Sequence, residues 1–435
     1  MRREAVLPSF VINFCAMKYD QSKIRVKNTT ANSFCIIYFL IFLLGSHSVR
    51  AEIIPGAARF NEYVPQLKGK KIALVANHTS QVGSVHLLDT LISLGLRIDK
   101  IFAPEHGFRG DAANGAAIAD AIDAKSGLPI VSLYGKSKKP KIKDLKGIDV
   151  VVFDMQDVGV RYYTYLSTLH YVMEACAENH ITLWVLDRPN PNGHYVDGPV
   201  LDPKFTQSMV GLHPIPLVHG MTLGELAMMI KGESWISNAQ ELALFVVSVA
   251  HYDHNTPYVL PIAPSPNLPS EASIILYPSL GLFEGTPMSM GRGTDWPFEV
   301  LGAPWFTRGT FEFTPINIPG KAFNPPYLGQ ICKGLKLTNF GLDYLRDYQQ
   351  IYLTWLIDSY VIYGKKADFF NSFFDKLAGT PALRTAIIAG QTEEEIRASW
   401  QVDLSIFKSK RRGYLLYAHD EARGNQYPTK TSKKP

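Results

Sequence analysis

Glu105 is the residue whose setting best suits acid–base chemistry. It follows Pro104 at the end of a short apolar run, and Gly107 and Gly110 leave room for a ligand beside it. A carboxyl group that is partly removed from water holds its proton more tightly, as a general acid requires. The alternative is a structural pair with Arg109 or His106. We predict that Glu105 is a general acid or an acid/base.

Three further acidic residues are candidates for a second carboxylate. Asp154 and Asp157 lie three residues apart after another apolar run, and Glu284 lies in a glycine-rich loop. Such a group can position a water molecule or accept a hydrogen bond from a ligand hydroxyl. For Asp157 the alternative is that it caps the helix that follows. We predict that Asp154 and Asp157 are catalytic together with Glu105, and Glu284 stays a further candidate.

The remaining candidates are polar or aromatic residues in loops near these carboxylates. An arginine can hold a carboxylate or phosphate through two parallel N–H donors, and a tyrosine ring can stack on a sugar. The alternative for each arginine is a structural ion pair. The residues predicted to bind substrate are Asn77, His78, His106, Gln156, Arg161, Tyr163, Arg188, Asn190, Asn267, Glu284 and Arg292.

Most of these residues follow short apolar segments that have the pattern of buried strands. The predicted strands are Lys71–Ala76, Lys100–Ala103, Pro129–Leu133, Asp149–Asp154 and Ile181–Leu186. Helical patterns such as Ser84–Leu94 and Tyr163–Asn179 separate them. This alternation predicts an α/β fold with a Rossmann-like, doubly wound, mostly parallel sheet. In such a sheet ligands bind beyond the carboxyl ends of the strands, where the candidate residues gather.

The chain is long enough for two domains. It has 435 residues, of which 46% are apolar and 19% are charged, a composition typical of globular proteins. We predict a Rossmann-like catalytic domain over residues 52–270 and a smaller α+β domain over 271–424 that contributes to the cleft. The second domain includes predicted helices at Tyr344–Val361 and Lys366–Leu377. The polar residues 425–435 are predicted to be a disordered tail.

Charge and missing motifs exclude several classes of function. The net charge of +5 is concentrated in residues 1–51, and the rest of the chain has 37 basic and 37 acidic residues. That balance gives no electrostatic bias toward nucleic acid. The sequence contains no GxGxxG, GxxxxGK[ST], HExxH or GxSxG motif. We therefore expect no nucleotide, no other cofactor, no metal site and no serine nucleophile.

The N-terminal segment has the pattern of a secretory signal peptide. Ten apolar residues, Cys35–Leu44, follow a basic stretch, and Val49 and Ala51 suit a cut after residue 51. Ten residues are too few to span a bilayer, although an uncleaved anchor is the alternative. We expect an exported protein, periplasmic or secreted, with no stable membrane anchor after cleavage. Cys176 and Cys332 would then remain, and pairing between them is left open.

Seven motifs together resemble a known enzyme family. They are VANHTS, FAPEHGFRG, DMQDVGVRYYTY, DRPNPNG, PSPNLP, YPSLGLFEGTPMSMGRGT and FFDKLAGT. They resemble the NamZ family of exo-acting β-N-acetylmuramidases, glycoside hydrolase family 171, from about Gly69 to Tyr417. The resemblance implies a Rossmann-like catalytic domain, a smaller C-terminal domain and an active site in the cleft between them. It also implies that Glu105, in the PEHG motif, is the catalytic glutamate.

The resemblance implies hydrolysis that releases N-acetylmuramic acid from the non-reducing ends of peptidoglycan fragments, in cell-wall recycling or in foraging on foreign wall. The expected substrate is the disaccharide N-acetylmuramic acid-β-1,4-N-acetylglucosamine. Carboxyl groups about 5 Å apart would indicate retention, and roughly 6.5–9.5 Å inversion, unless the substrate's acetamido group is the nucleophile. Two alternatives stay open. One is a catalytically silent muropeptide-binding protein, and the other is a metal-dependent hydrolase using His78, Glu105 and Asp154.

Overall fold

The computed structural model describes residues 51–105, 107–109, 121–135, 137–205 and 208–417. The predicted signal peptide, the predicted tail and His106 therefore lie outside the described residues, apart from Ala51. The chain from Glu52 onward forms one compact unit. Among the residues that are described, no helix has both the length and the apolar composition needed to cross a membrane.

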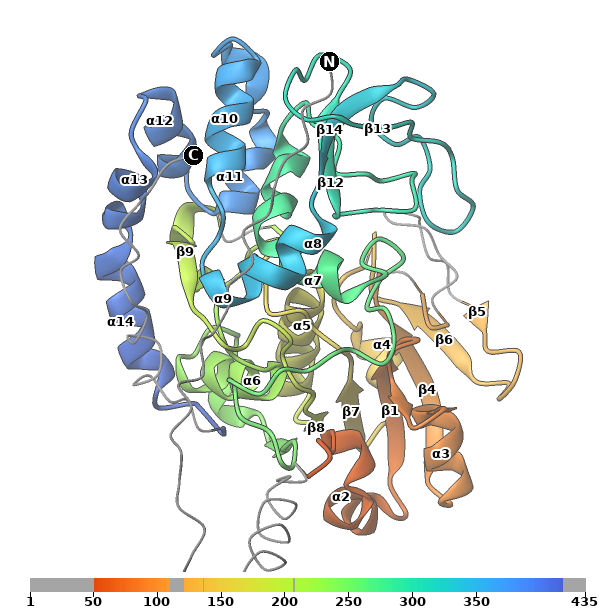
Figure 1. Cartoon of the computed structure of the whole chain (residues 1–435). Coiled ribbons are helices and arrows are strands. Elements are labelled where there is room, and N and C mark those ends of the chain that lie inside the picture. Colours follow the sequence, from red (N-terminus) through yellow and green to blue (C-terminus); the bar gives the residue numbers. More distant parts are fainter. Residues whose placement is uncertain (1–50, 106, 110–120, 136, 206–207, 418–435) are drawn as a thin grey trace, which may run out of the picture. The chain divides into compact units, whose positions relative to one another are not determined.

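The larger sheet confirms the predicted doubly wound fold (Figure 1). Six of its seven strands are parallel, and β5 at one edge is antiparallel to β6. In order across the sheet the strands are β11 (Leu244–Val247), β8 (Thr182–Leu186), β7 (Val150–Asp154), β1 (Lys71–Ala76), β4 (Arg97–Ala103), β6 (Pro129–Ser132) and β5 (Ala121–Ile122). The chain adds strands on one side of β1 and then on the other, so the strand order reverses between β1 and β7.

Alternating side chains explain why this sheet is covered on both faces. In β1, Ile72 and Leu74 belong to one apolar cluster, while Ala73 and Val75 belong to another. Successive residues of a strand point to opposite faces, so each apolar strand contributes side chains to two cores. The first cluster packs against α2 (Phe60–Leu67) and α3 (Leu87–Ser93). The second packs against α4 (Ile142–Leu145), α5 (Tyr165–Glu178) and α6 (Leu223–Gly232).

Short elements complete this part of the chain. The hairpin of β2 (Gln81–Val82) and β3 (Val85–His86) follows β1, and β9 (Asp197–Val200) pairs antiparallel with β10 (Pro216–Val218). Single turns of 3-10 helix are η1 (Gly56–Ala58), η2 (Pro203–Phe205) and η3 (Ala239–Glu241). The β2–β3 hairpin matters for the site because it follows the carboxyl end of β1 directly.

The second part of the chain combines a small antiparallel sheet with helices, as the α+β prediction requires. The sheet has the order β12 (Val300–Ala303), β14 (Cys332–Lys336) and β13 (Phe311–Phe313). The helical elements are α7 (Glu271–Leu280), η4 (Gly281–Gly285), α8 (Thr338–Phe340), η5 (Gly341–Leu345), α9 (Arg346–Tyr348), α10 (Thr354–Ile362), η6 (Ala367–Phe369), α11 (Ser372–Ala378), α12 (Ala382–Ile388), α13 (Glu393–Ser399) and α14 (Gln401–Arg411). In Figure 1 α10, α12 and the small sheet lie above the larger sheet.

Two predicted helices in this part are wrong in extent. The expected helix Tyr344–Val361 is broken after α9, where Gln349 adopts a left-handed conformation with φ of 54°. The expected helix Lys366–Leu377 is likewise divided into η6 and α11, and the Asn371 side chain caps α11 by accepting the Phe373 N–H. The apolar periodicity continues through both breaks, which is why the sequence suggested single helices.

Contacts cross the predicted domain boundary near residue 270, which stays a prediction. Tyr417 donates its hydroxyl to Asp187 at 2.7 Å, and the Leu416 N–H donates to Glu225 at 2.8 Å. The chain thus returns to the larger sheet at its end. Cys176 and Cys332 are both free and buried, so the pairing left open by the sequence is not formed in the structure.

Candidate active site

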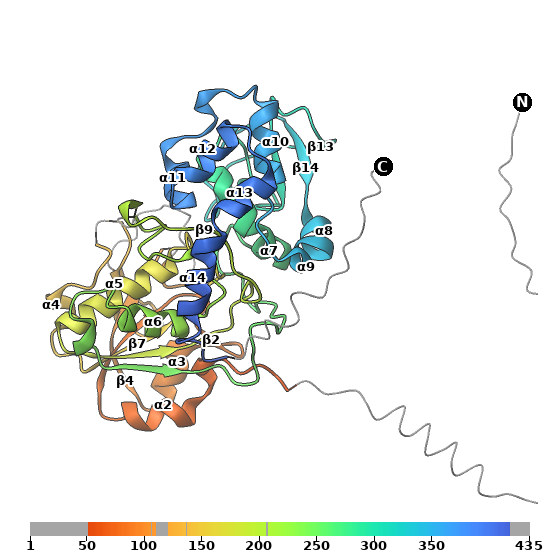
Figure 2. The same cartoon turned by 90° about the vertical axis from the view of Figure 1, so that its left-hand side faces the viewer.

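A cavity of about 910 Å³ opens beside the carboxyl end of β4 and contains Glu105. It is large enough for a small saccharide, since ligand pockets commonly measure roughly 300–1,000 Å³. Its walls come from both parts of the chain, including the start of α5, η4 and α11. Figure 2 shows α5 and α11 one above the other. The lining includes five residues predicted from the sequence, namely Glu105, Tyr163, Asn267, Glu284 and Arg292.

Glu105 is buried and held by two hydroxyl groups. The Thr164 hydroxyl donates to its Oε2 atom at 2.9 Å, and the Tyr134 hydroxyl also forms a hydrogen bond with its carboxyl group. Burial, and then the nearby charge of Glu105, raise the pKa of Tyr134 to about 12. The Tyr134 hydroxyl therefore stays protonated near neutral pH and can donate a hydrogen bond to Glu105. Arg109, one of the two partners considered for Glu105, forms a bidentate ion pair with Asp123 at 2.9 Å.

A second carboxylate faces the same cavity. Glu284 lies in η4, and its Oε1 atom accepts a hydrogen bond from Arg292 at 2.9 Å. Burial disfavours the charged form of Arg292, but the carboxylates of Glu284 and Glu105 outweigh it and raise its pKa. Arg292 also lies over the ring of Phe298, 5.4 Å from its centroid. The cavity thus contains two carboxylates, one held by hydroxyls and the other by a guanidinium group.

Tyrosine rings form a rigid wall between these two carboxylates and the core. Tyr162 donates its hydroxyl to the carbonyl oxygens of Tyr277 and Pro278, and Tyr163 donates to that of Pro264. The rings of Tyr162 and Tyr277 pack edge to face with centroids 5.2 Å apart. Burial raises the pKa of each of these tyrosines well above its ordinary value. They present neutral aromatic surface, which suits the apolar face of a sugar ring.

Asn267, the fifth predicted residue in the cavity, belongs to the loop that precedes α7. Its backbone N–H donates to the Ser265 hydroxyl at 3.2 Å, and its side chain donates to the Lys321 carbonyl at 3.4 Å. The side chain therefore joins the two parts of the chain at the edge of the cavity.

Asp154, at the end of β7, and Arg188, just after β8, do not line this cavity. They form an ion pair with each other, which we call the closed pair. Arg188 Nε and Nη2 donate to the two oxygens of Asp154 at 2.6 and 2.9 Å, and both residues are buried. Arg188 Nη2 also donates to the Gln81 carbonyl in the β2–β3 hairpin. Both carboxylate oxygens of Asp154 thus bond to Arg188, which is a structural partner. The structure gives it no access to the cavity around Glu105.

Asp157 is also buried and outside the cavity lining. Its Oδ2 atom accepts the Gly159 N–H at 2.7 Å and lies 4.0 Å from His219 Nε2. Burial raises the pKa of Asp157 to about 7. It does not cap α5, because that helix begins at Tyr165. Asp157 instead stabilises the turn that carries the chain from β7 toward the tyrosine wall.

The other predicted ligands serve internal hydrogen bonds, and none lines the cavity. Arg161 is buried and donates to the carbonyl oxygens of Pro199, Ile215 and Leu377, and burial lowers its pKa to about 9. The remaining side chains bond to neighbouring loops, namely Asn77 to Thr79, His78 to Ala263, Gln156 to Asp157 and Pro189, and Asn190 to Met221. His106 lies outside the described residues.

Sequence reasoning missed Thr164, Tyr134 and three lysines of the cavity, Lys138, Lys204 and Lys376. A signal existed for Tyr134, because it follows the predicted strand Pro129–Leu133 at the same sheet edge as Glu105. Thr164 was hidden within a predicted helix. The lysines come from loops and helices far apart in the sequence, and no local pattern joins them.

The metal-dependent alternative receives no geometric support in the described part of the chain. No group of three or more His, Cys, Asp or Glu side chains there is arranged to hold a metal ion. Of its three residues, Asp154 is bonded to Arg188, and His78 Nε2 lies 2.9 Å from the Ala263 carbonyl oxygen. Only Glu105 lines the cavity.

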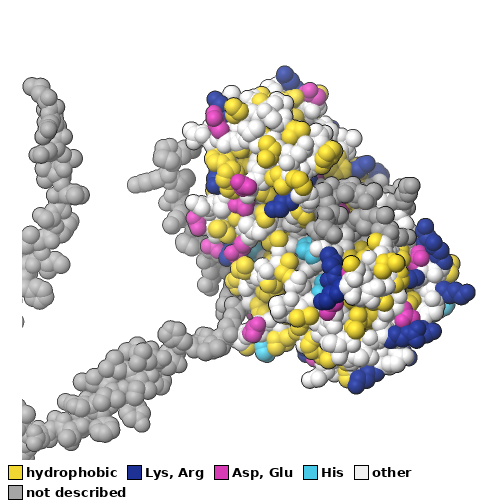
Figure 3. Space-filling view, turned by 90° about the vertical axis from the view of Figure 1, so that its right-hand side faces the viewer, with side chains coloured by type: hydrophobic (Ala, Val, Ile, Leu, Met, Phe, Trp, Pro, Cys, Tyr) yellow, Lys and Arg dark blue, Asp and Glu magenta, His cyan; other side chains and the backbone are white. Residues whose placement is uncertain are grey.

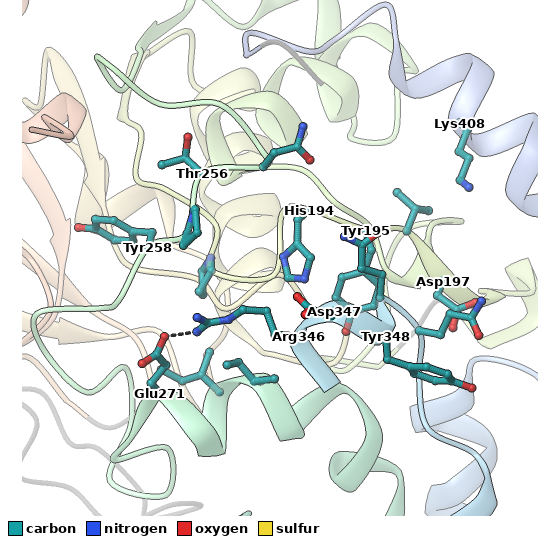
Figure 4. A pocket seen from close by; sticks show the side chains of 18 of the residues that line it. His194, Tyr195, Asp197, Thr256, Tyr258, Glu271, Arg346, Asp347, Tyr348 and Lys408 are labelled. Carbon is teal, nitrogen blue, oxygen red and sulfur yellow. Dashed lines mark hydrogen bonds and ion pairs between the residues drawn. The ribbon is translucent and has the colours of Figure 1, made fainter. Parts of the chain in front are cut away.

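A second cavity, of about 750 Å³, lies on the other side of α7 (Figure 4). Figure 4 shows the ring of His194 near its centre and Arg346 paired with Glu271 below. Asp197, another lining carboxylate, is held by Arg397 at 2.9 Å. None of the residues predicted from the sequence lines this cavity. The cavity of Glu105, which five of the predicted residues line, is therefore the better candidate for acid catalysis.

Comparisons with known proteins agree along most of the chain. A family model described as the N-terminal part of the exo-beta-N-acetylmuramidase NamZ matches residues 72–272, and the model of its C-terminal part matches residues 275–417. The peptidoglycan beta-N-acetylmuramidase NamZ of Bacillus subtilis (strain 168) is 40% identical over 379 residues, which cover 82% of this chain and 89% of that protein.

Two crystal structures of DUF1343 family proteins from Bacteroides fragilis NCTC 9343 are also similar. One has 46% sequence identity and a TM-score of 0.79, and the match covers 85% of this chain and all of that one. The other has 29% identity and a TM-score of 0.71, with 84% and 99% covered. The fold and the order of its parts are therefore shared along nearly the full length of these relatives.

Proposed function

The chain belongs to the NamZ family of exo-β-N-acetylmuramidases, and we propose that the cavity around Glu105 is where it cleaves its substrate. The protein is a glycoside hydrolase that releases N-acetylmuramic acid from the non-reducing ends of peptidoglycan fragments. The observation that carries the site assignment is that Glu105 and Glu284 line one cavity, whereas Asp154 and Asp157 do not.

In this proposal Glu105 is the general acid. Cleavage breaks the bond between the anomeric carbon and the bridging oxygen, and the departing oxygen needs a proton. Glu105 is buried, and the hydroxyls of Thr164 and Tyr134 fix the direction of its carboxyl group. Such positioning lets a proton donor meet the leaving oxygen without reorganisation. Water completes the reaction and returns a proton to the enzyme.

Glu284 is the second carboxylate of the proposed site. Of the three candidates named from the sequence, it alone lines the cavity of Glu105. Arg292 donates a hydrogen bond to its Oε1 atom and so fixes the direction of its carboxyl group. An ionised carboxylate beside the anomeric centre stabilises positive charge that develops there as the leaving oxygen departs.

The direct test is a set of matched Glu→Gln variants acting on N-acetylmuramic acid-β-1,4-N-acetylglucosamine, with product followed by mass spectrometry. E105Q keeps the shape of the side chain but cannot donate an acid proton. We expect its kcat to fall by about 10³-fold, within the usual range for loss of a general acid. E271Q, in the second cavity, is the control and should keep wild-type turnover. Normal turnover by E105Q would overturn the assignment.

Two further parts of the proposal are that the protein is exported and that it cleaves the disaccharide N-acetylmuramic acid-β-1,4-N-acetylglucosamine. The apolar segment Cys35–Leu44 with its basic flank supports secretion to the periplasm or the medium, without an anchor after cleavage. Expression of the full chain in a bacterial host, followed by intact-mass measurement of the exported product, tests this. A product that begins at Glu52 supports cleavage after Ala51. A full-length product held in the membrane fraction would contradict it.

A further inference from the structure

Three lysines share the cavity of Glu105 although they belong to separate segments. Lys138 follows β6, Lys204 lies in η2 and Lys376 lies in α11. Lys204 and Lys376 are exposed, and Lys138 is partly exposed. Lysine and arginine side chains are also spread over the face in Figure 3, where both are dark blue, so exposure alone carries no argument. What distinguishes these three is that they border one concave site.

The cavity offers these lysines no carboxylate in the described part of the chain. Its two acidic lining residues are already held, Glu105 by Thr164 and Tyr134, and Glu284 by Arg292. The contrast with the next lysine along the chain is direct. Lys139, beside Lys138, forms ion pairs with Glu174 at 2.9 Å and Glu178 at 2.6 Å.

We propose that Lys138, Lys204 and Lys376 form a cationic rim that binds a carboxylate on the lactyl arm of the substrate's muramic acid residue. This inference rests on the proposed function. N-acetylmuramic acid differs from N-acetylglucosamine by a lactyl ether on O3, which ends in a carboxyl group. Either the free lactyl carboxylate or the carboxylates of a peptide attached to it bring the same negative charge to this rim.

The rim acts on recognition more than on the chemical step. Three like charges around one opening repel each other, and an anion between them relieves that repulsion. Lysine acts as a mobile point charge, so it tolerates variation in where the carboxylate lies. A contact made equally in the bound substrate and the transition state changes KM and leaves kcat unchanged. The rim thus favours a muramic acid terminus over an N-acetylglucosamine terminus.

The test compares two disaccharides that differ in the charge of the lactyl group. One is N-acetylmuramic acid-β-1,4-N-acetylglucosamine, and the other carries an N-methylamide in place of the lactyl carboxylate. Because one exposed charge pair is weak, each single Lys→Ala change should raise KM for the charged substrate by about two- to fivefold. The triple variant K138A/K204A/K376A should raise it by about tenfold or more at low salt, with kcat unchanged. KM for the neutral amide should not change.

A matched control removes the same charge elsewhere. The triple variant K68A/K70A/K71A changes exposed lysines before and at the start of β1, at the opposite sheet edge from Glu105, and should behave as wild type. Added salt should raise KM for the charged substrate in wild type and have little effect in the rim variant. Equal effects of the rim variant on both substrates would overturn the proposal. So would an unchanged KM for the charged one.

A third substrate separates the two sources of the carboxylate. It carries a dipeptide on the lactyl group and therefore lacks the lactyl carboxylate but has peptide carboxylates. If the rim variant loses affinity only for this substrate, the rim binds the peptide carboxylates. If it loses affinity only for the peptide-free disaccharide, the rim binds the lactyl carboxylate. Failure of wild-type enzyme to cleave any of the three would instead contradict the proposed function, so the two failures are distinguishable.

Discussion

The carboxyl ends of β4 and β7 present similar acidic residues and use them in opposite ways. Glu105, after β4, borders a cavity and is held by neutral hydroxyls. Asp154, at the end of β7, has no exposed surface and is bonded by both oxygens to Arg188. One carboxyl group lines an open cavity. The other carboxyl group, that of Asp154, has both oxygens bonded to Arg188 in a structural ion pair.

The difference arises from what fills the point where the strand order reverses. In open α/β sheets that point, here between β1 and β7, is the usual ligand crevice. In this chain the hairpin β2–β3 and Arg188 occupy it, since Arg188 donates to Gln81 and the Ser80 hydroxyl bonds the Asp154 carbonyl. The open cavity is displaced to the β4 side. A polar residue at a strand end is therefore a candidate for a site only where it lines an open cavity.

Removing the guanidinium group of the closed pair should have the largest effect on stability. R188A leaves Asp154 as a buried carboxylate without its partner, which typically costs about 3–5 kcal/mol. Denaturant unfolding should show that loss in the free energy of unfolding. Turnover per folded molecule should stay close to wild type. A stable R188A that lacks activity would mean that the closed pair takes part in catalysis.

Changing the second carboxylate of the open cavity should affect turnover rather than folding. E284Q removes the negative charge beside Arg292, and we expect kcat to fall by about 10²-fold with KM little changed. Steady-state kinetics on the disaccharide measures this. Wild-type turnover in E284Q would show that the cavity works with Glu105 alone and that Glu284 only holds Arg292.

The effect of Asp157 should appear in the pH dependence of stability. Its pKa in the folded protein is about 7, against 3.8 as the ordinary value. Below about pH 4 both states hold the proton. Between about pH 4 and 7 the unfolded chain releases it while the folded chain keeps it, so stability falls as pH rises, by up to about 1.4 kcal/mol per pH unit.

D157N should therefore remove this loss. Unfolding curves for wild type and D157N across pH 4 to 8 should diverge up to about pH 7, with the variant increasingly favoured, and then run parallel. A constant difference between the two proteins over this range would show that Asp157 titrates normally in the fold.

The sequence was sufficient for the architecture because strands buried on both faces leave continuous apolar runs such as Lys71–Ala76. Local spacing also indicated Glu105 and the loop that holds Glu284 and Arg292, all of which line one cavity. It could not identify the Asp154–Arg188 pair, whose partners are 34 positions apart. Nor could it separate a closed strand end from an open one, because that depends on which loop folds back over it. The rim lysines were missed for the same reason.

The most direct test of this account measures kcat for E105Q and D154N on N-acetylmuramic acid-β-1,4-N-acetylglucosamine, corrected for the folded fraction of each. We expect E105Q to retain about one thousandth of wild-type turnover while its stability is unchanged. We expect D154N to be less stable but to turn over normally per folded molecule. An active E105Q together with a folded, inactive D154N would contradict both expectations and move the catalytic centre to the end of β7.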